Sequence, residues 1–177
     1  EYNGKAEFGF TLEPAPGFER KAIDQVLQEK YNKDFTKISN KEIVDTVFNY
    51  IIDKETHIYN KYKALYFLRD MQTEEAIVAL GNLLNVEHRE ATGALLRHEV
   101  CFALGMLADK AKVLKDRLEK TIADKTESSI VRHEAISAYS SALTDISFLK
   151  NYLEDDSRVV KESAIVAIDM IEYWGQA

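Results

Sequence analysis

The sequence has little cysteine, proline or glycine, and each shortage excludes a class of protein. Its one cysteine, Cys101, excludes an internal disulfide framework and a cysteine-based zinc cluster, and it fits a reducing compartment such as the cytoplasm. Two prolines and seven glycines among 177 residues leave few interruptions to helix. No uninterrupted apolar run approaches the roughly 20 residues that a membrane span needs, so we expect no membrane partner.

Basic residues are also fewer than acidic ones, 23 against 30, which gives a net charge of −7. A nucleic-acid partner held by phosphate neutralisation is therefore not expected. The chain begins at Glu1 rather than Met and shows no basic-then-apolar signal segment, so we expect a piece of a longer polypeptide. The composition, 46% hydrophobic and 30% charged, is that of a globular domain.

The few helix-breaking residues gather at the N-terminus. Both prolines and three of the seven glycines lie within residues 1–17, which predicts a linker or extended arm. Apolar spacing then predicts a helix over Phe18–Tyr31. Ser39 followed by Glu42 is a capping-box pattern that predicts the start of the next helix. We expect the mostly polar segment between them, Lys30–Asn40, to form a surface loop.

From Tyr59 the chain repeats itself. Four segments align by eye, at residues 59–64, 95–100, 130–135 and 159–164. A basic residue recurs in them with steps of 36, 35 and 29, at Lys61, Arg97, Arg132 and Lys161. Each segment continues into an apolar helix, and second helical patterns lie at 74–84, 110–122 and 146–153. A helix pair every ~30–40 residues is typical of HEAT repeats, so the predicted fold is an all-α solenoid of about four HEAT-like repeats.

The two middle repeats carry His-Glu after the basic residue, as His98-Glu99 and His133-Glu134, where the outer repeats do not. Equivalent residues of stacked helices lie ~8–10 Å apart, so His98 and His133 could share one metal ion. Successive residues on a helix diverge by about 100°, so His98 and Glu99 are not expected to bind the same ion. Glu99 or Glu134 would then face a second ion or a partner outside the first coordination sphere.

Imidazole and carboxylate ligands with open positions suit non-haem iron, and the remaining ligands would have to come from outside this chain. His57, at a helix start, and His88, in a polar loop, do not occupy the repeat position, and we expect both on the surface. The alternative for the Arg-His-Glu segments is ordinary helix capping, because glutamate is favourable near the positive end of a helix dipole.

The order of the repeats, together with the two His-Glu pairs, resembles the deoxyhypusine hydroxylase family. The matching residues are 62–64, 68–69, 93–100, 104–105, 131–135, 159–163, 167–170 and 172–173. The family has two similar halves of four HEAT repeats joined by a linker, and this chain resembles the C-terminal half. The resemblance divides it into the linker or arm at 1–17, a helical segment with a lineage-specific insertion at 18–55, and HEAT-like repeats at 56–177.

The resemblance also implies roles for these residues. His98 and His133 match histidine ligands of one iron, and Glu99 matches a carboxylate that crosses to the other iron. Glu134 matches a glutamate that is second-sphere or substrate-facing rather than a primary ligand. The N-terminal half of the same enzyme would supply the reciprocal ligands, so this chain would carry half of a di-iron site and be inactive alone.

The implied reaction uses molecular oxygen to hydroxylate deoxyhypusine to hypusine on a translation elongation factor. An acidic solenoid suits such a polycationic side chain, since opposite charges steer encounter. A different class also remains open, in which the chain is a non-catalytic HEAT scaffold or a bilin-lyase-like binding protein. His98 and His133 would then be packing or capping residues.

Overall fold

The computed structural model describes residues 20–174, and within this range the chain is helical, without strands. The α-helices are α1 Arg20–Tyr31, α2 Asn40–Ile52, α3 Ile58–Met71, α4 Glu74–Asn82, α5 Arg89–Met106, α6 Lys115–Ala123, α7 Ser129–Ala142, α8 Ile146–Leu149 and α9 Arg158–Trp174. Short 3-10 helices are η1 Val86–His88, η2 Ala108–Leu114 and η3 Lys150–Tyr152. The predicted all-α fold is confirmed, and the predicted arm at 1–17 lies outside the described residues. No helix from residue 20 to residue 174 is both long and apolar enough to cross a membrane.

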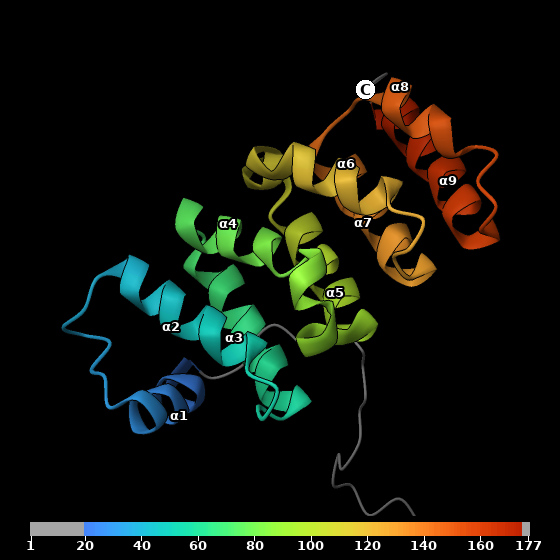
Figure 1. Ribbon diagram of the computed structural model, residues 1–177. Helices are drawn as coiled ribbons and strands as arrows, with labels where there is room; N and C mark the ends of the chain where they lie inside the picture. The colour runs from blue at the N-terminus through green and yellow to red at the C-terminus, as the bar shows by residue number, and fades with distance from the viewer. Residues whose placement is uncertain (1–19, 175–177) are drawn as a thin grey trace, which may run out of the picture.

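The helices that carry the repeated segments stack in one row. Helix α5 packs against α3 on one side and α7 on the other, and α7 packs against α9 (Figure 1). The intervening helices form the second layer. Within this layer α4 contacts η2, and α6 packs onto α7 of the first row. Two of the predicted second helices are shorter than expected, because η2 precedes α6 over residues 108–114 and η3 follows α8 over residues 150–152.

Helix α2 begins where the capping box predicts. Ser39 caps α2, and its Oγ accepts a hydrogen bond from the Glu42 N–H at 3.2 Å, as the capping box predicts. The loop before α2 is not purely a solvated segment, because the Phe35 ring lies 6.3 Å from the Phe67 ring of α3. This contact fastens the loop to the first repeated helix.

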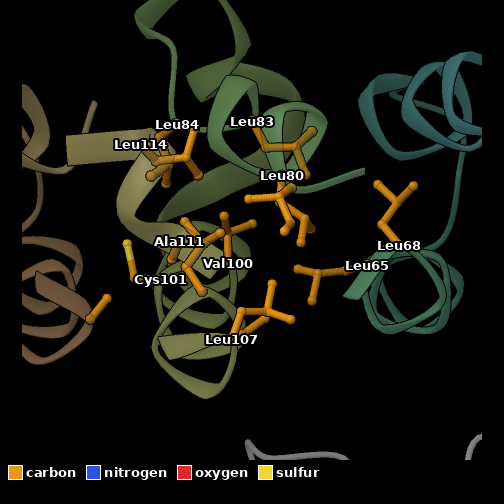
Figure 2. Close-up of a cluster of buried hydrophobic side chains, with 14 of the residues drawn as sticks. Leu65, Leu68, Leu80, Leu83, Leu84, Val100, Cys101, Leu107, Ala111 and Leu114 are labelled. Atoms are coloured by element: carbon orange, nitrogen blue, oxygen red, sulfur yellow. The ribbon is translucent and has the colours of Figure 1, made fainter. Parts of the chain in front are cut away.

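The core lies between the two layers. Leucines of α3 and α4 meet Val100 of α5 and the apolar residues of η2 (Figure 2). Leu65, Leu80 and Val100 are completely buried. Cys101 is also completely buried, as expected of a small core residue, and burial raises the pKa of its thiol, which keeps it protonated.

The recurring basic residue joins each repeat to the next. Three of these side chains donate to groups just before the next repeated helix or in its first turn: Lys61 to the Ala91 carbonyl at 2.6 Å, Arg97 to both oxygens of Glu127 at 2.6 and 3.0 Å, and Arg132 to both oxygens of Asp155 at 2.6 and 3.1 Å. Asp155 belongs to an acidic run that composition alone would assign to a solvated loop, yet its side chain is 4% exposed. The basic periodicity therefore reflects ion pairs and hydrogen bonds between repeats.

Helix α5 contains a backbone break at Gly93, where φ is 69° and ψ is 163°. The residues before the break form one turn, and the regular helix continues from Ala94. The break returns the Arg89 carbonyl toward Arg97, whose Nη1 donates to it at 3.1 Å. Only glycine adopts such a conformation readily, so the kink depends on this residue.

Candidate metal centre

The direction of each side chain on α5 follows from its neighbours in the stack. Arg97 faces the following repeat through Glu127, whereas Glu99 faces the preceding repeat, where the Tyr66 hydroxyl donates to it. Two residues apart on a helix are about 200° apart around its axis, which accounts for these opposite directions. His98, between them, is partly buried, and its Nε2 is directed toward Glu134 of the following repeat.

Helix α7 repeats this arrangement one step along the solenoid. Glu134 extends back toward α5, where its Oε2 lies 3.5 Å from His98 Nε2 and 3.5 Å from His133 Nε2. The rings of His98 and His133 are 6.3 Å apart, centroid to centroid. One ligand atom from each of the three residues falls within 4.8 Å of the others. The three side chains are partly buried, with exposed fractions of 21%, 38% and 13% for His98, His133 and Glu134.

This spacing fits a metal ion. Ligand atoms held about 2.1 Å from one ion in a tetrahedral arrangement are about 3.4 Å apart, close to the two separations that Glu134 makes. Two imidazoles and one carboxylate form a donor set suited to iron or zinc, with coordination positions left open. Two of these residues, His133 and Glu134, are successive in α7, so the expectation that successive residues do not reach one ion is not met here: the Glu134 side chain is long enough to bring its Oε2 within 3.5 Å of His133 Nε2. The third, His98, comes from α5, so the group joins neighbouring repeats.

The surroundings of His133 favour its metal-binding form. Burial lowers its pKa, which favours the neutral imidazole that binds metals. Its Nδ1 lies 2.7 Å from Ser163 Oγ on α9, so its two ring nitrogens face different partners. Nδ1 contacts the next helix, while Nε2 faces Glu134.

Glu99 lies outside this group. It is completely buried between α3 and α5, where it accepts the hydrogen bond from Tyr66. Burial, and then the negative charge of Glu99, raise the pKa of Tyr62 to about 12. The structure thus brings together three of the four residues predicted for the metal site, His98, His133 and Glu134, and places Glu99 at the preceding junction. Which of the four binds metal stays a prediction.

The other two histidines lie away from the cluster. His57 is exposed at the N-cap of α3, and its Nδ1 accepts from the Tyr59 N–H at 3.3 Å, in agreement with the expected surface position. His88 is partly buried, because its ring packs edge-on against Phe48 at 5.3 Å. The expectation of a solvated His88 is therefore only partly met.

Sequence reasoning did not single out Ser163 or Tyr66 as neighbours of the site residues. A signal was present in the repeat register, because Ser163 occupies the same position of its repeat as Glu99 and Glu134. Each of these residues extends back to the preceding helix. The shared register could have identified Ser163 as the residue next to His133.

The sequence is similar to those of several proteins that share one name. No protein-family model matches the chain. Deoxyhypusine hydroxylase from Drosophila melanogaster is 37% identical over 124 residues, which cover 69% of this chain and 39% of that protein. The same enzyme from Danio rerio is 30% identical over 165 residues, covering 92% and 45%. The chain is related to the deoxyhypusine hydroxylases.

The fold supports the same relationship. The solved structure of human deoxyhypusine hydroxylase in complex with glycerol matches with a TM-score of 0.62 and 33% identity. That match covers 73% of this chain and 43% of the human one. The HEAT-like solenoid predicted from the repeats is thereby confirmed. The chain spans less than half the length of these deoxyhypusine hydroxylases.

Proposed function

We propose that this chain is the C-terminal half of a deoxyhypusine hydroxylase and contributes half of a di-iron site. The complete enzyme would hydroxylate deoxyhypusine to hypusine on a translation elongation factor in the cytoplasm, using molecular oxygen. The observation that carries the proposal is the convergence of His98, His133 and Glu134 across the α5–α7 junction. The relationship to named deoxyhypusine hydroxylases supports the same reaction.

In this proposal His98 and His133 hold an iron ion from one side. Glu134 is a further ligand or, as the family resemblance implies, a group outside the first coordination sphere. Glu99, buried against Tyr66 at the α3–α5 junction, would be the carboxylate of a second iron. Bound iron would supply the activation of oxygen that hydroxylation of a saturated carbon requires. The chain's own contribution is to fix the imidazoles on two stacked helices, which keeps their separation constant.

The remaining ligands would come from the N-terminal half of the enzyme. Two histidines and a carboxylate leave coordination positions open, so a facing set of side chains could complete the site. The net charge of −7 favours approach of a cationic side chain such as deoxyhypusine. The chain alone is therefore expected to bind iron weakly and to lack turnover.

The test compares this chain with the full-length protein, both purified without chelator and supplied with ferrous iron. Iron content and hydroxylation of a deoxyhypusine-bearing substrate protein are measured for each. We expect about two irons and turnover in the full-length protein, and little iron and no turnover in the chain. Hydroxylation by the monomeric chain would contradict the split site.

Substitutions in the full-length protein test the residues. His98→Ala and His133→Ala should each lower iron content and reduce hydroxylation by at least about 100-fold, because each removes a proposed ligand. His57→Ala is the matched control, since His57 lies outside the cluster. Unchanged iron content in both cluster variants would rule out the proposed metal site and favour a scaffold function.

A further inference from the structure

Ser163 lies between a backbone carbonyl and the ring of His133. Its Oγ is 2.6 Å from the Val159 carbonyl oxygen one turn earlier in α9, and 2.7 Å from His133 Nδ1 on α7. Both separations are those of well-formed hydrogen bonds. A hydroxyl has one proton to donate, so the two contacts cannot both use it.

The position of that proton follows from the two partners. The Val159 carbonyl oxygen can only accept, so an oxygen–oxygen distance of 2.6 Å requires the Ser163 proton between them. The Ser163 oxygen is then left with its lone pairs toward His133 and must accept from that ring. His133 Nδ1 therefore carries a proton, and in the neutral ring Nε2 carries the free lone pair.

The opposite side of the ring gives this assignment its importance. His133 Nε2 lies 3.5 Å from Glu134 Oε2, within the group that includes His98. In the other neutral tautomer Nε2 would carry the proton and could not bind a metal. A hydrogen bond at one ring nitrogen commonly selects which nitrogen of a metal-binding histidine is free.

We propose that Ser163 is a positioning residue that holds His133 in its Nδ1–H tautomer and thereby presents Nε2 to the cluster of His98 and Glu134. The part of this inference that concerns metal binding rests on the proposed function. The part that concerns the tautomer does not, since it follows from two hydrogen bonds in the chain itself.

The repeat register explains why a serine performs this role here. In the preceding repeat the corresponding residue, Glu134, is long enough to reach the Nε2 atom of His98. Ser163 is shorter and stays bonded to its own helix, so it meets the nearer nitrogen of His133. Helix α9 thus contacts the His133 ring at Nδ1, through Ser163, whereas α7 contributes the carboxylate of Glu134 to the cluster.

The test measures the tautomer of His133 in the metal-free 177-residue chain from the imidazole nitrogen chemical shifts by NMR. Wild type should show Nδ1 protonated and Nε2 unprotonated. Ser163→Ala should give a mixture of tautomers, whereas Ser163→Thr, which keeps a hydroxyl able to bond the carbonyl one turn earlier, should retain the wild-type form. Circular dichroism checks that each variant is folded.

A cobalt(II) titration of the same proteins supplies the second readout. Ser163→Ala should weaken cobalt binding about tenfold, the lower range for loss of an outer-sphere partner, and Ser163→Thr should restore it. Ser137→Ala is the matched control, because the Ser137 hydroxyl donates to the His133 backbone carbonyl, at 3.4 Å, rather than to the His133 ring. It should change neither readout.

The outcomes separate this inference from the proposed function. An Nε2–H tautomer in wild type, or an unchanged tautomer in folded Ser163→Ala, overturns the role of Ser163. The predicted tautomer change in a chain that binds no cobalt supports the role of Ser163 and counts against the metal site. A tautomer change with unaltered cobalt affinity would overturn the claim that Ser163 prepares Nε2 for a metal.

Discussion

At the scale of single residues, the repeat is held by charges that composition alone would place on the surface. Arg97 and Glu127 form a bidentate ion pair, and their side chains are only 5% and 1% exposed. A planar guanidinium matches a carboxylate in this way, which a lysine cannot do. Such a pair depends strongly on both members, because loss of either leaves the other charge buried.

Removal of Arg97 should therefore be costly. Arg97→Met is expected to lower the free energy of unfolding by about 1–3 kcal/mol, because Glu127 would lose its two hydrogen bonds from Arg97 and keep only Arg89, whose Nε lies 3.2 Å from its Oε2. The double variant Arg97→Met with Glu127→Gln should lose less than the sum of the single variants. Urea unfolding followed by circular dichroism measures both.

The exposed pair Arg158–Glu162 provides the control. Its atoms approach to 2.7 Å, but the side chains are 87% and 56% exposed. Arg158→Met should leave the unfolding midpoint unchanged, because solvent screens such pairs. Similar losses from Arg97→Met and Arg158→Met would show that the buried bridge between repeats does not stabilise the fold as argued.

A second prediction at this scale concerns the stability of the fold at low pH. Hydrogen bonds from the Thr126 side chain and backbone, and then Arg89, lower the pKa of Asp124 from 3.8 to about 2. A carboxyl with a lowered folded-state pKa stabilises the fold above its unfolded pKa, and this contribution disappears as the pH falls through the folded value. Its contribution is thus complete above about pH 5, mostly lost by about pH 2 and absent near pH 1.

Asp124→Asn should accordingly be less stable than wild type at pH 7, by at most about 1 kcal/mol, because solvent screens a partly exposed pair. The difference should shrink below about pH 4 and be mostly lost by about pH 2. Urea unfolding at a series of pH values measures it. A difference that stays constant down to pH 2 would show that the charge of Asp124 is not the cause.

At the scale of elements, the break in α5 is the least regular feature of the stack. Gly93 has a positive φ with an extended ψ, and a Cβ added there would meet nothing within 4 Å. Gly93→Ala should therefore destabilise the chain through backbone strain alone, by about 1–3 kcal/mol. Thermal or urea unfolding measures the loss.

Gly105→Ala in the same helix is the matched control. The backbone of Gly105 is helical, and an added Cβ would lie 3.4 Å from Ala138 Cα, an ordinary contact. Alanine is favoured over glycine in a helix by about 1 kcal/mol, so this variant should be neutral or more stable. If both variants lose the same free energy of unfolding, the positive φ at Gly93 does not strain an alanine placed there.

The elements also show which features the sequence could predict. The start of α2 was predictable because Ser39 and Glu42 act on their own helix terminus. The stacking was predictable because a basic residue recurs at the same position of each repeat. The kink at Gly93 and the division of the second helices into α and 3-10 parts were not, because they depend on packing between helices.

For the candidate site, too, one part could be predicted from the sequence and another could not. Repeat register alone predicted that His98 and His133 would be neighbours, and their rings are 6.3 Å apart. The register could not predict that Glu134, rather than Glu99, would share their cluster. That choice depends on which side of each helix faces the preceding repeat, a property of the whole stack.

At the scale of the whole molecule, the solenoid is nearly one-dimensional, since α5 packs against α3 and α7 in the row, and α7 packs against α5 and α9. A ligand that joins two repeats should therefore stabilise those repeats most, and its effect should diminish along the row. The cluster of His98, His133 and Glu134 lies between α5 and α7. Helix α1 lies at the far end of the stack, against α2 and α3 (Figure 1).

This geometry predicts where a metal would protect the chain. Cobalt(II) at about ten times its dissociation constant should add about 1.4 kcal/mol to the opening free energy of the repeats that it joins. Amide hydrogen exchange measured by NMR should slow about tenfold in α5 and α7 and stay unchanged in α1, which packs against α2 and α3. His133→Ala should abolish the effect and His57→Ala preserve it, since only His133 belongs to the cluster.

A metal that bridges two adjacent repeats can act directly only on those two. Equal protection throughout the chain, or protection that survives in His133→Ala, would therefore mean that the metal binds elsewhere.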